Sequence, residues 1–369
     1  MRANNTLRIH VINVGHGDSL LVEMPDEAKT PHRPRFGLVD AGGEDAEVKT
    51  KTLDYLETFL NYRLERAPAL NSSAADFLFE FVCLTHPHND HLHGMQPVLN
   101  HYCADTYPAA MRPQQFWDCG FRYNTISYLA LLDFLGQHTE VKFIRVTSGT
   151  EFHYDEVEVM TAAPSIDMRN RYDTYGVNVN DASIVLRITL GSGVVILTGD
   201  AHFDSWGKLC EEFPRTKHLI YPRDSTGEPD MRDPNREDIA FMNQENQLNC
   251  QLLKVSHHGS KRGTSYEYIE KLSPSHFAIA CDNDADYPAS WKHKFPHPIT
   301  RLILGEEAGT FSASSVQIPD LGALGSSTAT TAALGTLIYR ITRGGQVTRV
   351  NLGEGKHTRP TVNDLVQKL

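Results

Sequence analysis

The chain has 369 residues, of which 40% are hydrophobic and 22% are charged, as is ordinary for a globular protein. Its formal net charge of −11 excludes a strongly basic nucleic-acid-binding surface over the whole molecule. No apolar run approaches the roughly 20 residues that cross a bilayer, and residues 1–7 lack the apolar core of a signal peptide.

Apolar periodicity predicts the alternation of strands and helices that is typical of a layered α/β protein. Residues 7–24 are expected to form a hairpin, because alternating apolar residues flank the glycine-rich turn at 15–18. A phosphate-cradling loop is the alternative for this turn, but no helical pattern follows it. Further strands are expected at 36–40, 77–84, 115–119, 141–146, 183–190, 194–197, 252–255, 277–280, 336–342 and 346–352, and two more within 151–162. Helices are expected at 46–64, 92–100 and 126–136.

The six cysteines are scattered along the chain without a C-x-x-C pair. Several of them lie in apolar runs, which favours buried free thiols over a disulfide framework. Reduced thiols, together with the absence of a membrane-spanning run, lead us to expect a cytoplasmic protein without a membrane partner.

The segment after the strand at 77–84 concentrates the side chains that bind metals. Four histidines and an aspartate fall within eight residues, namely His86, His88, Asp90, His91 and His93. His86 and His88 are two apart in extended chain and so point to the same side. Asp90 and His91 leave in another direction, where the chain turns into a helix. One ion cannot easily take all four ligands, so two adjacent divalent ions are expected. A histidine-rich surface loop or tag would explain neither the buried strand nor the aspartate.

Two later apolar strands also end in metal-ligand residues. The strand at 194–197 leads into Thr198-Gly199-Asp200, and the strand at 252–255 leads into Ser256-His257-His258-Gly259. With the first segment, this order resembles the metallo-β-lactamase fold signature H-x-H-x-D-H. The subgroup it resembles most is the metallo-β-lactamase domain of ComEC/Rec2 competence proteins, through the sequences VGHGDS at 14–19, NDASIVL at 180–186 and PHP at 296–298.

The resemblance covers roughly residues 7–300 and implies a four-layer αββα sandwich. We therefore expect one domain over residues 1–369, with its core at 7–300 and further strands within about 312–352. The segment at about 214–249 interrupts the pattern and is expected to be an insertion with a short helix near 237–247. An insertion of this length is either a functional lid or a decoration of the fold, and the sequence leaves both open.

The resemblance also implies a ligand set for two divalent ions, Zn²⁺ or Mn²⁺. The first ion is expected to bind His86 and His88, and the second to bind Asp90, His91 and His257. Asp200 bridges them, because the two oxygens of a carboxylate can span neighbouring ions.

The usual third histidine of the first ion has no clear match. Asn180 or Asp181 lies in its place and is expected to coordinate weakly, with His202 a less favoured substitute. Oxygen ligands there would favour manganese over zinc. Asp40 ends the strand at 36–40 and is expected to orient the metal-binding loop rather than to bind an ion.

The ion pair implies hydrolysis by a metal-activated hydroxide that Asp90 or Asp200 holds. His258 and His297 are expected to bind substrate or to protonate the leaving oxygen. Lys254, Lys261 and Arg262 bracket the paired histidines and suggest a basic rim for an anionic substrate.

Three functions remain open on the sequence. The leading one is a phosphodiesterase or nuclease, because the resembled subgroup is linked to DNA degradation, with nucleic acid or a nucleotide as the substrate. The second is a carboxylic ester, lactone or thioester hydrolase of the same fold. The third is a metal-stabilised binding protein without catalysis, whose partner is another protein or a second copy of the chain.

Overall fold

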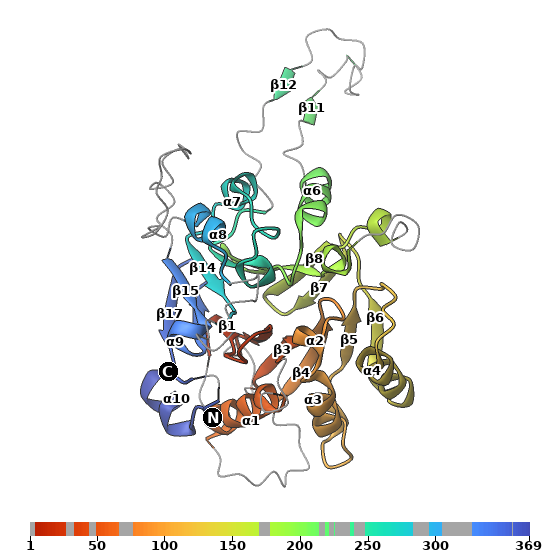
Figure 1. Cartoon of the computed structure of the whole chain (residues 1–369), viewed down its shortest axis with the longest axis vertical. Coiled ribbons are helices and arrows are strands. Elements are labelled where there is room, and N and C mark those ends of the chain that lie inside the picture. The colour runs from red at the N-terminus through yellow and green to blue at the C-terminus, as the bar shows by residue number, and fades with distance from the viewer. Residues whose placement is uncertain are drawn as a thin grey trace.

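The computed structural model describes twelve stretches of the chain: 4–26, 33–43, 49–65, 77–169, 178–213, 218–220, 225, 237–239, 248–282, 295–304, 327–355 and 357–369. Two large sheets dominate them (Figure 1). The first has eight strands in the order β17 (Val347–Asn351), β16 (Leu337–Ile341), β1 (Leu7–Val11), β2 (Ser19–Met24), β3 (Arg35–Ala41), β4 (Leu78–Leu84), β5 (Gln115–Asp118) and β6 (Lys142–Arg145).

The second sheet has seven strands, in the order β15 (Ser327–Thr330), β14 (His276–Ile279), β13 (Leu252–Lys254), β10 (Gly193–Leu197), β9 (Val185–Leu190), β8 (Val157–Ala163) and β7 (Glu151–Tyr154). The predicted hairpins at 7–24, 183–197 and 336–352 are confirmed as the antiparallel pairs β1–β2, β9–β10 and β16–β17. Strands β3 to β6 run parallel to one another, as do β10, β13, β14 and β15, so the carboxyl ends within each group share one edge.

Three apolar cores separate four layers. One core lies between the sheets and joins residues such as Ile9 of β1 to Ile188 of β9. A second joins the outer face of the first sheet to α1 (Lys51–Leu64), α3 (Met95–Tyr102) and α4 (Ile126–Gln137). A third joins the second sheet to α6 (Phe203–Glu212) and α7 (Tyr266–Leu272) on the opposite side (Figure 1). The predicted four-layer αββα sandwich is therefore confirmed, with central strands such as β2, β3 and β10 buried on both faces.

A buried charge cluster fixes α1 to the first sheet. Glu23 of β2 is fully buried, and Arg63 of α1 reaches it with a 2.5 Å ion pair. Burial opposes ionisation of Glu23, but Arg63 and Arg8 outweigh burial and lower the pKa of Glu23 to about 2. The charge in this otherwise apolar strand therefore has its partners within the fold.

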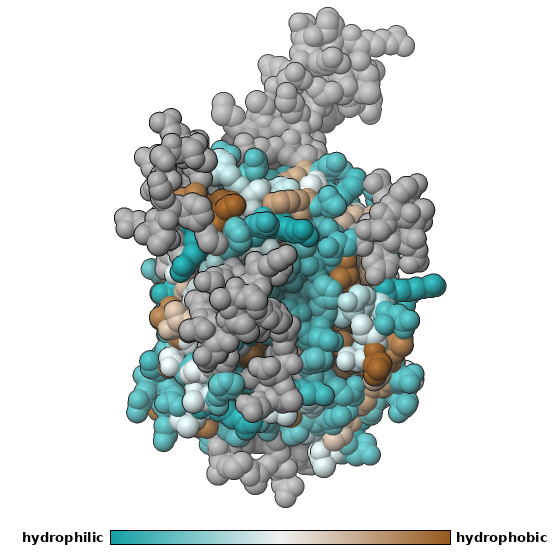
Figure 2. All heavy atoms as spheres, in the orientation of Figure 1, coloured by the Kyte–Doolittle hydropathy of each residue, from teal (hydrophilic) through white to brown (hydrophobic). Residues whose placement is uncertain are grey.

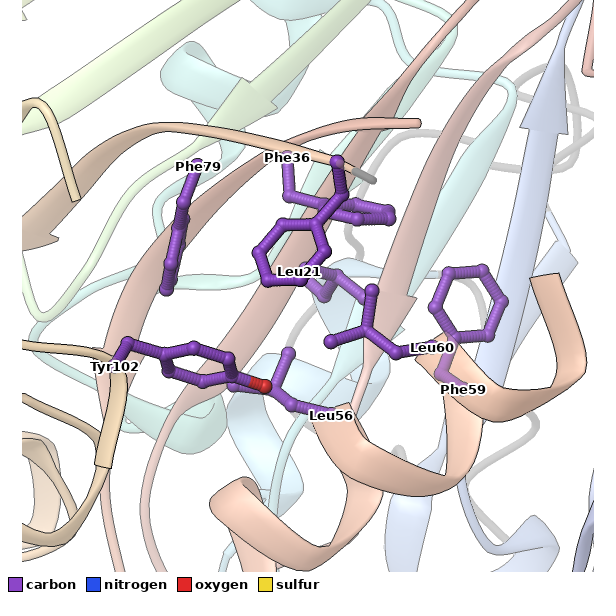
Figure 3. Close-up of a pocket in the computed structure, with 8 residues that line it drawn as sticks. Leu21, Phe36, Leu56, Phe59, Leu60, Phe79 and Tyr102 are labelled. Carbon is purple, nitrogen blue, oxygen red and sulfur yellow. The ribbon is translucent and has the colours of Figure 1, made fainter. Parts of the chain in front are cut away.

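The surface and the pocket that the structure describes do not point to a second site. In the view of Figure 2 the described surface is mostly hydrophilic, and exposed apolar side chains such as Ile126 and Leu129 of α4 are few. Figure 3 shows a pocket under α1 whose lining is almost wholly apolar, formed by Leu21, Phe36, Leu56, Phe59, Leu60, Phe77, Phe79 and Tyr102. No candidate metal ligand lines it.

Several predicted elements differ in the structure. The helix predicted from residue 46 begins at Lys51, with 44–48 outside the described residues, and the helix predicted at 92–100 is two helices, α2 (Asn89–Leu92) and α3. The helix predicted at 237–247 is wrong at its start, because β12 (Glu237–Ile239) pairs there with β11 (His218–Ile220); residues 240–247 lie outside the described ranges. Helices α6, α7, α8 (Pro298–Ile303), α9 (Thr331–Leu334) and α10 (Val362–Lys368) were not predicted.

The cysteines and the helices bear on two further predictions. All six cysteines are free and five of them are buried, which confirms the prediction of buried thiols. Within the described ranges, none of the helices has the length and apolarity that a bilayer crossing requires.

Candidate metal centre

The candidate ligands meet where β4, β10 and β13 end. Chain segments that follow parallel strands gather at one edge of a sheet. The backbone N–H of Ile184 donates to the carbonyl of Thr85 over 2.9 Å and ties the start of β9 to the end of β4. The three motifs that follow these strands therefore converge in space, as the sequence predicts.

Four side chains form the group that we call site 2: Asp90, His91, Asp200 and His258. Their ligand atoms lie within 4.8 Å of one another. His91 Nε2 is 3.2 Å from Asp200 Oδ1, and His258 Nε2 is 3.2 Å from Asp90 Oδ2. Two imidazoles and two carboxylates are enough for a four-coordinate divalent ion.

Three side chains form the neighbouring group, site 1: His86, His88 and Asp200. His86 Nε2 lies 3.1 Å from His88 Nδ1 and 3.8 Å from Asp200 Oδ2. Asp200 thus turns Oδ1 to site 2 and Oδ2 to site 1, which is the bridging geometry expected from the sequence.

The donor atoms fit divalent cations. Asp200 is 1% exposed, yet among the described residues neither of its carboxylate oxygens has a hydrogen-bond partner, and neither does the buried Nε2 of His91. Leaving a carboxylate buried and unpaired is costly. A cation at each site would satisfy these atoms, and imidazole with carboxylate suits zinc and manganese.

Asp40 and Thr85 fix the rings of two ligands from behind. Asp40 Oδ2 accepts from His91 Nδ1 over 2.7 Å, and Asp40 Oδ1 accepts from the backbone N–H of Thr85 over 2.7 Å. Thr85 Oγ1 donates to Asp40 and lies 3.2 Å from Nδ1 of His86, from which it can accept. In the neutral imidazoles the proton therefore sits on Nδ1, so each Nε2 can offer a lone pair to a cation.

His258 is held by a buried ion pair. Its Nδ1 donates to the carbonyl of Ala280 over 2.8 Å and lies 3.4 Å from Asp18 Oδ1, while Lys254 Nζ pairs with Asp18 Oδ2. The side chains of Lys254 and Asp18 are 1% and 0% exposed. The prediction that Lys254 belongs to a basic rim is therefore wrong, because it neutralises a buried carboxylate. Lys261 and Arg262 are both exposed.

The structure places His258, rather than His257, in the ligand group of site 2. His258, predicted to transfer protons, contributes Nε2 to site 2, whereas His257, predicted as the ligand there, turns Nε2 toward Asp200 Oδ2 at 3.6 Å. Both residues have left-handed φ, at 49° and 53°. This conformation costs roughly 1–2 kcal/mol per residue and sends adjacent side chains to opposite sides of Asp200, which residue spacing alone does not reveal.

The other predicted residues lie around the ligands. Asn180 Nδ2 contacts His202 Nε2 at 3.1 Å, whereas Asp181 Oδ1 accepts from the backbone N–H of Ser205 and caps the start of α6. His297 Nδ1 accepts from the backbone N–H of Ile299 and caps α8. The structure thus gives Asp181 and His297 capping contacts, and their expected ligand and proton-transfer roles stay predictions.

Sequence reasoning missed His16. Its Nε2 lies 3.7 Å from Asp90 Oδ2, and its ring packs 4.6 Å from that of His258 and stacks on Phe295 at 5.6 Å. Burial and the charge of His258 lower its pKa to about 4, so the imidazole is neutral at pH 7. The glycines on both sides of His16 are the signal in the sequence, because they let the backbone of this turn come close to the metal-binding loop.

Two glycines allow this turn to approach the metal-binding loop. A Cβ on Gly17 would lie 2.4 Å from the carbonyl oxygen of Asp90, and one on Gly42 would lie 1.7 Å from it. The backbone N–H of Asp18 donates to the same oxygen over 3.0 Å. Any larger residue would displace Asp90 from site 2.

The carboxylates and imidazoles of the site shift one another's pKa values. Burial opposes ionisation of Asp200, but the surrounding imidazoles, that of His257 foremost, outweigh burial and hold its pKa well below the ordinary value. Burial would lower the pKa of His258, but Asp200 and its hydrogen bonds to nearby carboxylates raise it to about 10. Burial holds the pKa of His86 well below its ordinary value, which keeps this ligand neutral.

No family model matches the chain, and no curated protein matches it. Among solved structures, the chain is similar to the metallo-β-lactamase fold protein YhfI from Bacillus subtilis, with 12% identity and a TM-score of 0.35 over 73% of this chain and 85% of that one. It is similar to a diphosphatase from the PhnP family, with 12% identity and a TM-score of 0.37 over the same shares.

It is also similar to CmlA, a diiron β-hydroxylase from Streptomyces venezuelae, with 14% identity and a TM-score of 0.33 over 76% of this chain. The chain spans 45% of the length of that protein. The function of this chain is therefore inferred from its own residues.

Proposed function

We propose that the chain is a metal-dependent hydrolase that cleaves phosphodiesters, nucleic acid or a nucleotide, with two divalent ions. The observation that carries this proposal is the division of Asp200 between two ligand groups, with both of its oxygens buried. The ComEC/Rec2-like motifs are the reason to prefer a phosphodiester over a carboxylic ester. A cytoplasmic location and a protein partner or second copy of the chain remain predictions.

Two divalent ions in such a site supply an activated water near neutral pH and stabilise the charge that builds on phosphoryl oxygens. Asp200 sets the spacing of the two sites. The side chain of Asp90 is 14% exposed, so it can accept a hydrogen bond from an entering water. His16 is neutral at pH 7 and lies beside Asp90, where its ring can form a hydrogen bond with the same water.

The substrate would meet positive charge outside the ligand groups as well. Lys261 and Arg262 follow the paired histidines after Gly259 and Ser260, and both are exposed. Together with two bound cations they offset the local carboxylates, so an anionic substrate is compatible with a net charge of −11.

Hydrolysis of bis-p-nitrophenyl phosphate and of p-nitrophenyl acetate, each with and without Mn²⁺ or Zn²⁺, tests the proposal. We expect metal-dependent turnover of the phosphodiester that is lost in Asp90→Ala. Asp105→Ala is the matched control, because this carboxylate is fully exposed on the surface. Turnover of the acetate alone would favour an esterase, and silence on both substrates would favour a binding protein.

A further inference from the structure

Site 1 has fewer ligands than site 2. His86, His88 and Asp200 supply three donor atoms, against four at site 2. Asn180 and Asp181, expected as weak ligands there, lie outside this group: Asp181 caps α6, and the amide nitrogen of Asn180 contacts His202. A fourth ligand of site 1 would therefore come from another segment of the chain.

His257 stands beside this gap. Its Nε2 lies 3.6 Å from Asp200 Oδ2, the same oxygen that faces His86 Nε2 at 3.8 Å. The left-handed backbone at residues 257 and 258 directs the two rings to different oxygens of Asp200. His257 is thus on the site 1 side, and His258 is on the site 2 side.

The hydrogen bonds behind His257 leave its Nε2 available. His257 Nδ1 lies 2.6 Å from His202 Nε2, and Asn180 Nδ2 donates to the same His202 nitrogen over 3.1 Å. With the amide nitrogen of Asn180 as the donor, His202 Nε2 is the acceptor, and the tautomer of His257 that carries its proton on Nδ1 satisfies the second contact. The lone pair on His257 Nε2 then faces the negative Oδ2 of Asp200, and the two repel each other. A cation bound between them would turn this repulsion into attraction.

We propose that His257 is the third imidazole of site 1, and that His202 and Asn180 position it. The paired histidines then serve one ion each. His257 takes the place of the histidine that is missing between the first motif and Asp200, although it comes from a later motif. The inference rests on the proposed two-ion site, but not on any particular substrate.

Counting bound ions in double variants tests this assignment without any activity assay. Elemental analysis after equilibrium dialysis should find two ions per chain in the unchanged protein. His257→Ala combined with His88→Ala removes two ligands of one ion and should retain one ion. His257→Ala combined with His258→Ala removes a ligand from each site and should lose both.

The reverse pattern would overturn the assignment, because it would place His257 in site 2. Two ions retained with unchanged affinity in the single variant His257→Ala would overturn it as well. No ion bound by the unchanged protein would instead defeat the proposed function itself. His153→Ala is the matched control, since this histidine is exposed on β7.

His202 has a separate signature as a positioning residue. His202→Ala should weaken the binding of one ion by about 10- to 100-fold, as is usual when the partner behind a ligand is lost. His257→Ala should weaken the same ion more. Equal loss at both sites in His202→Ala, seen by titration calorimetry, would show a general structural role instead.

Discussion

The two ion sites share one carboxylate but differ in how the chain supports them. At site 2, four ligands come from three segments, and Asp40, Ala280 and the Asp18–Lys254 pair hold the rings behind them. At site 1, three ligands form the group, and His88 is only partly buried. Enclosed, fully supported sites bind more firmly, so site 2 should keep its ion longest and site 1 should exchange its ion more easily.

Removing the shared ligand should have the largest effect, because it breaks both sites at once. Asp200→Ala should lower kcat/KM for a phosphodiester by at least about 10³-fold, since each ion supplies several kcal/mol of transition-state stabilisation. Steady-state kinetics and metal content measure this, with Asp105→Ala as control. A variant that keeps two ions and near-normal turnover would show that Asp200 does not bridge.

The ion pair behind site 2 should matter most for folding. Lys254→Met leaves Asp18 buried without its partner and should lower the free energy of unfolding by about 3–5 kcal/mol. The double variant Lys254→Met, Asp18→Asn should recover most of that loss. Urea unfolding measures both, with Lys208→Met as a surface control. If the double variant is no more stable than the single one, Lys254 does not compensate the buried charge of Asp18, and the account of this ion pair is wrong.

The bond behind His91 separates the two sites. Asp40→Asn weakens the acceptor for His91 Nδ1–H and should reduce the affinity of site 2 by about 10- to 100-fold. Site 1 should be weakened less, because Asp40 contacts its ligand His86 only through Thr85. Titration with Zn²⁺ measures this. Asp118→Asn is the control, as a buried carboxylate that accepts from Tyr128 and Gly120. Equal weakening by both variants would mean a general effect on folding.

The smallest effect is a pH dependence of stability. The pKa of His258 rises from 6.5 to about 10 in the folded chain, so its charge stabilises the metal-free protein fully below pH 6.5, and this contribution is lost as the pH approaches 10. A cation must displace that proton, so metal affinity should increase over the same window. The difference in Tm with and without metal should therefore widen from pH 6 to pH 9.5. A constant difference would contradict the placement of His258 in site 2.

The sequence predicts the strands and the ends from which ligands emerge, because apolar runs and the residues after them are local features. It does not predict which of two adjacent histidines faces which ion, because the sign of φ at residues 257 and 258 depends on the surrounding packing. Nor does it predict that Lys254 is buried, since its partner Asp18 lies far away in the chain. Helix α6 was missed, although Trp206 and Leu209, three residues apart on one buried face, are an apolar pair with helical spacing.

The most direct test of the two-ion site is the number of divalent ions that the purified chain binds at saturation. Elemental analysis after dialysis against Mn²⁺ or Zn²⁺ should give two ions per chain, falling to none or a weakly held remnant in Asp200→Ala. A chain that binds no ion, or that binds two ions whether or not Asp200 is present, would contradict the bridged centre.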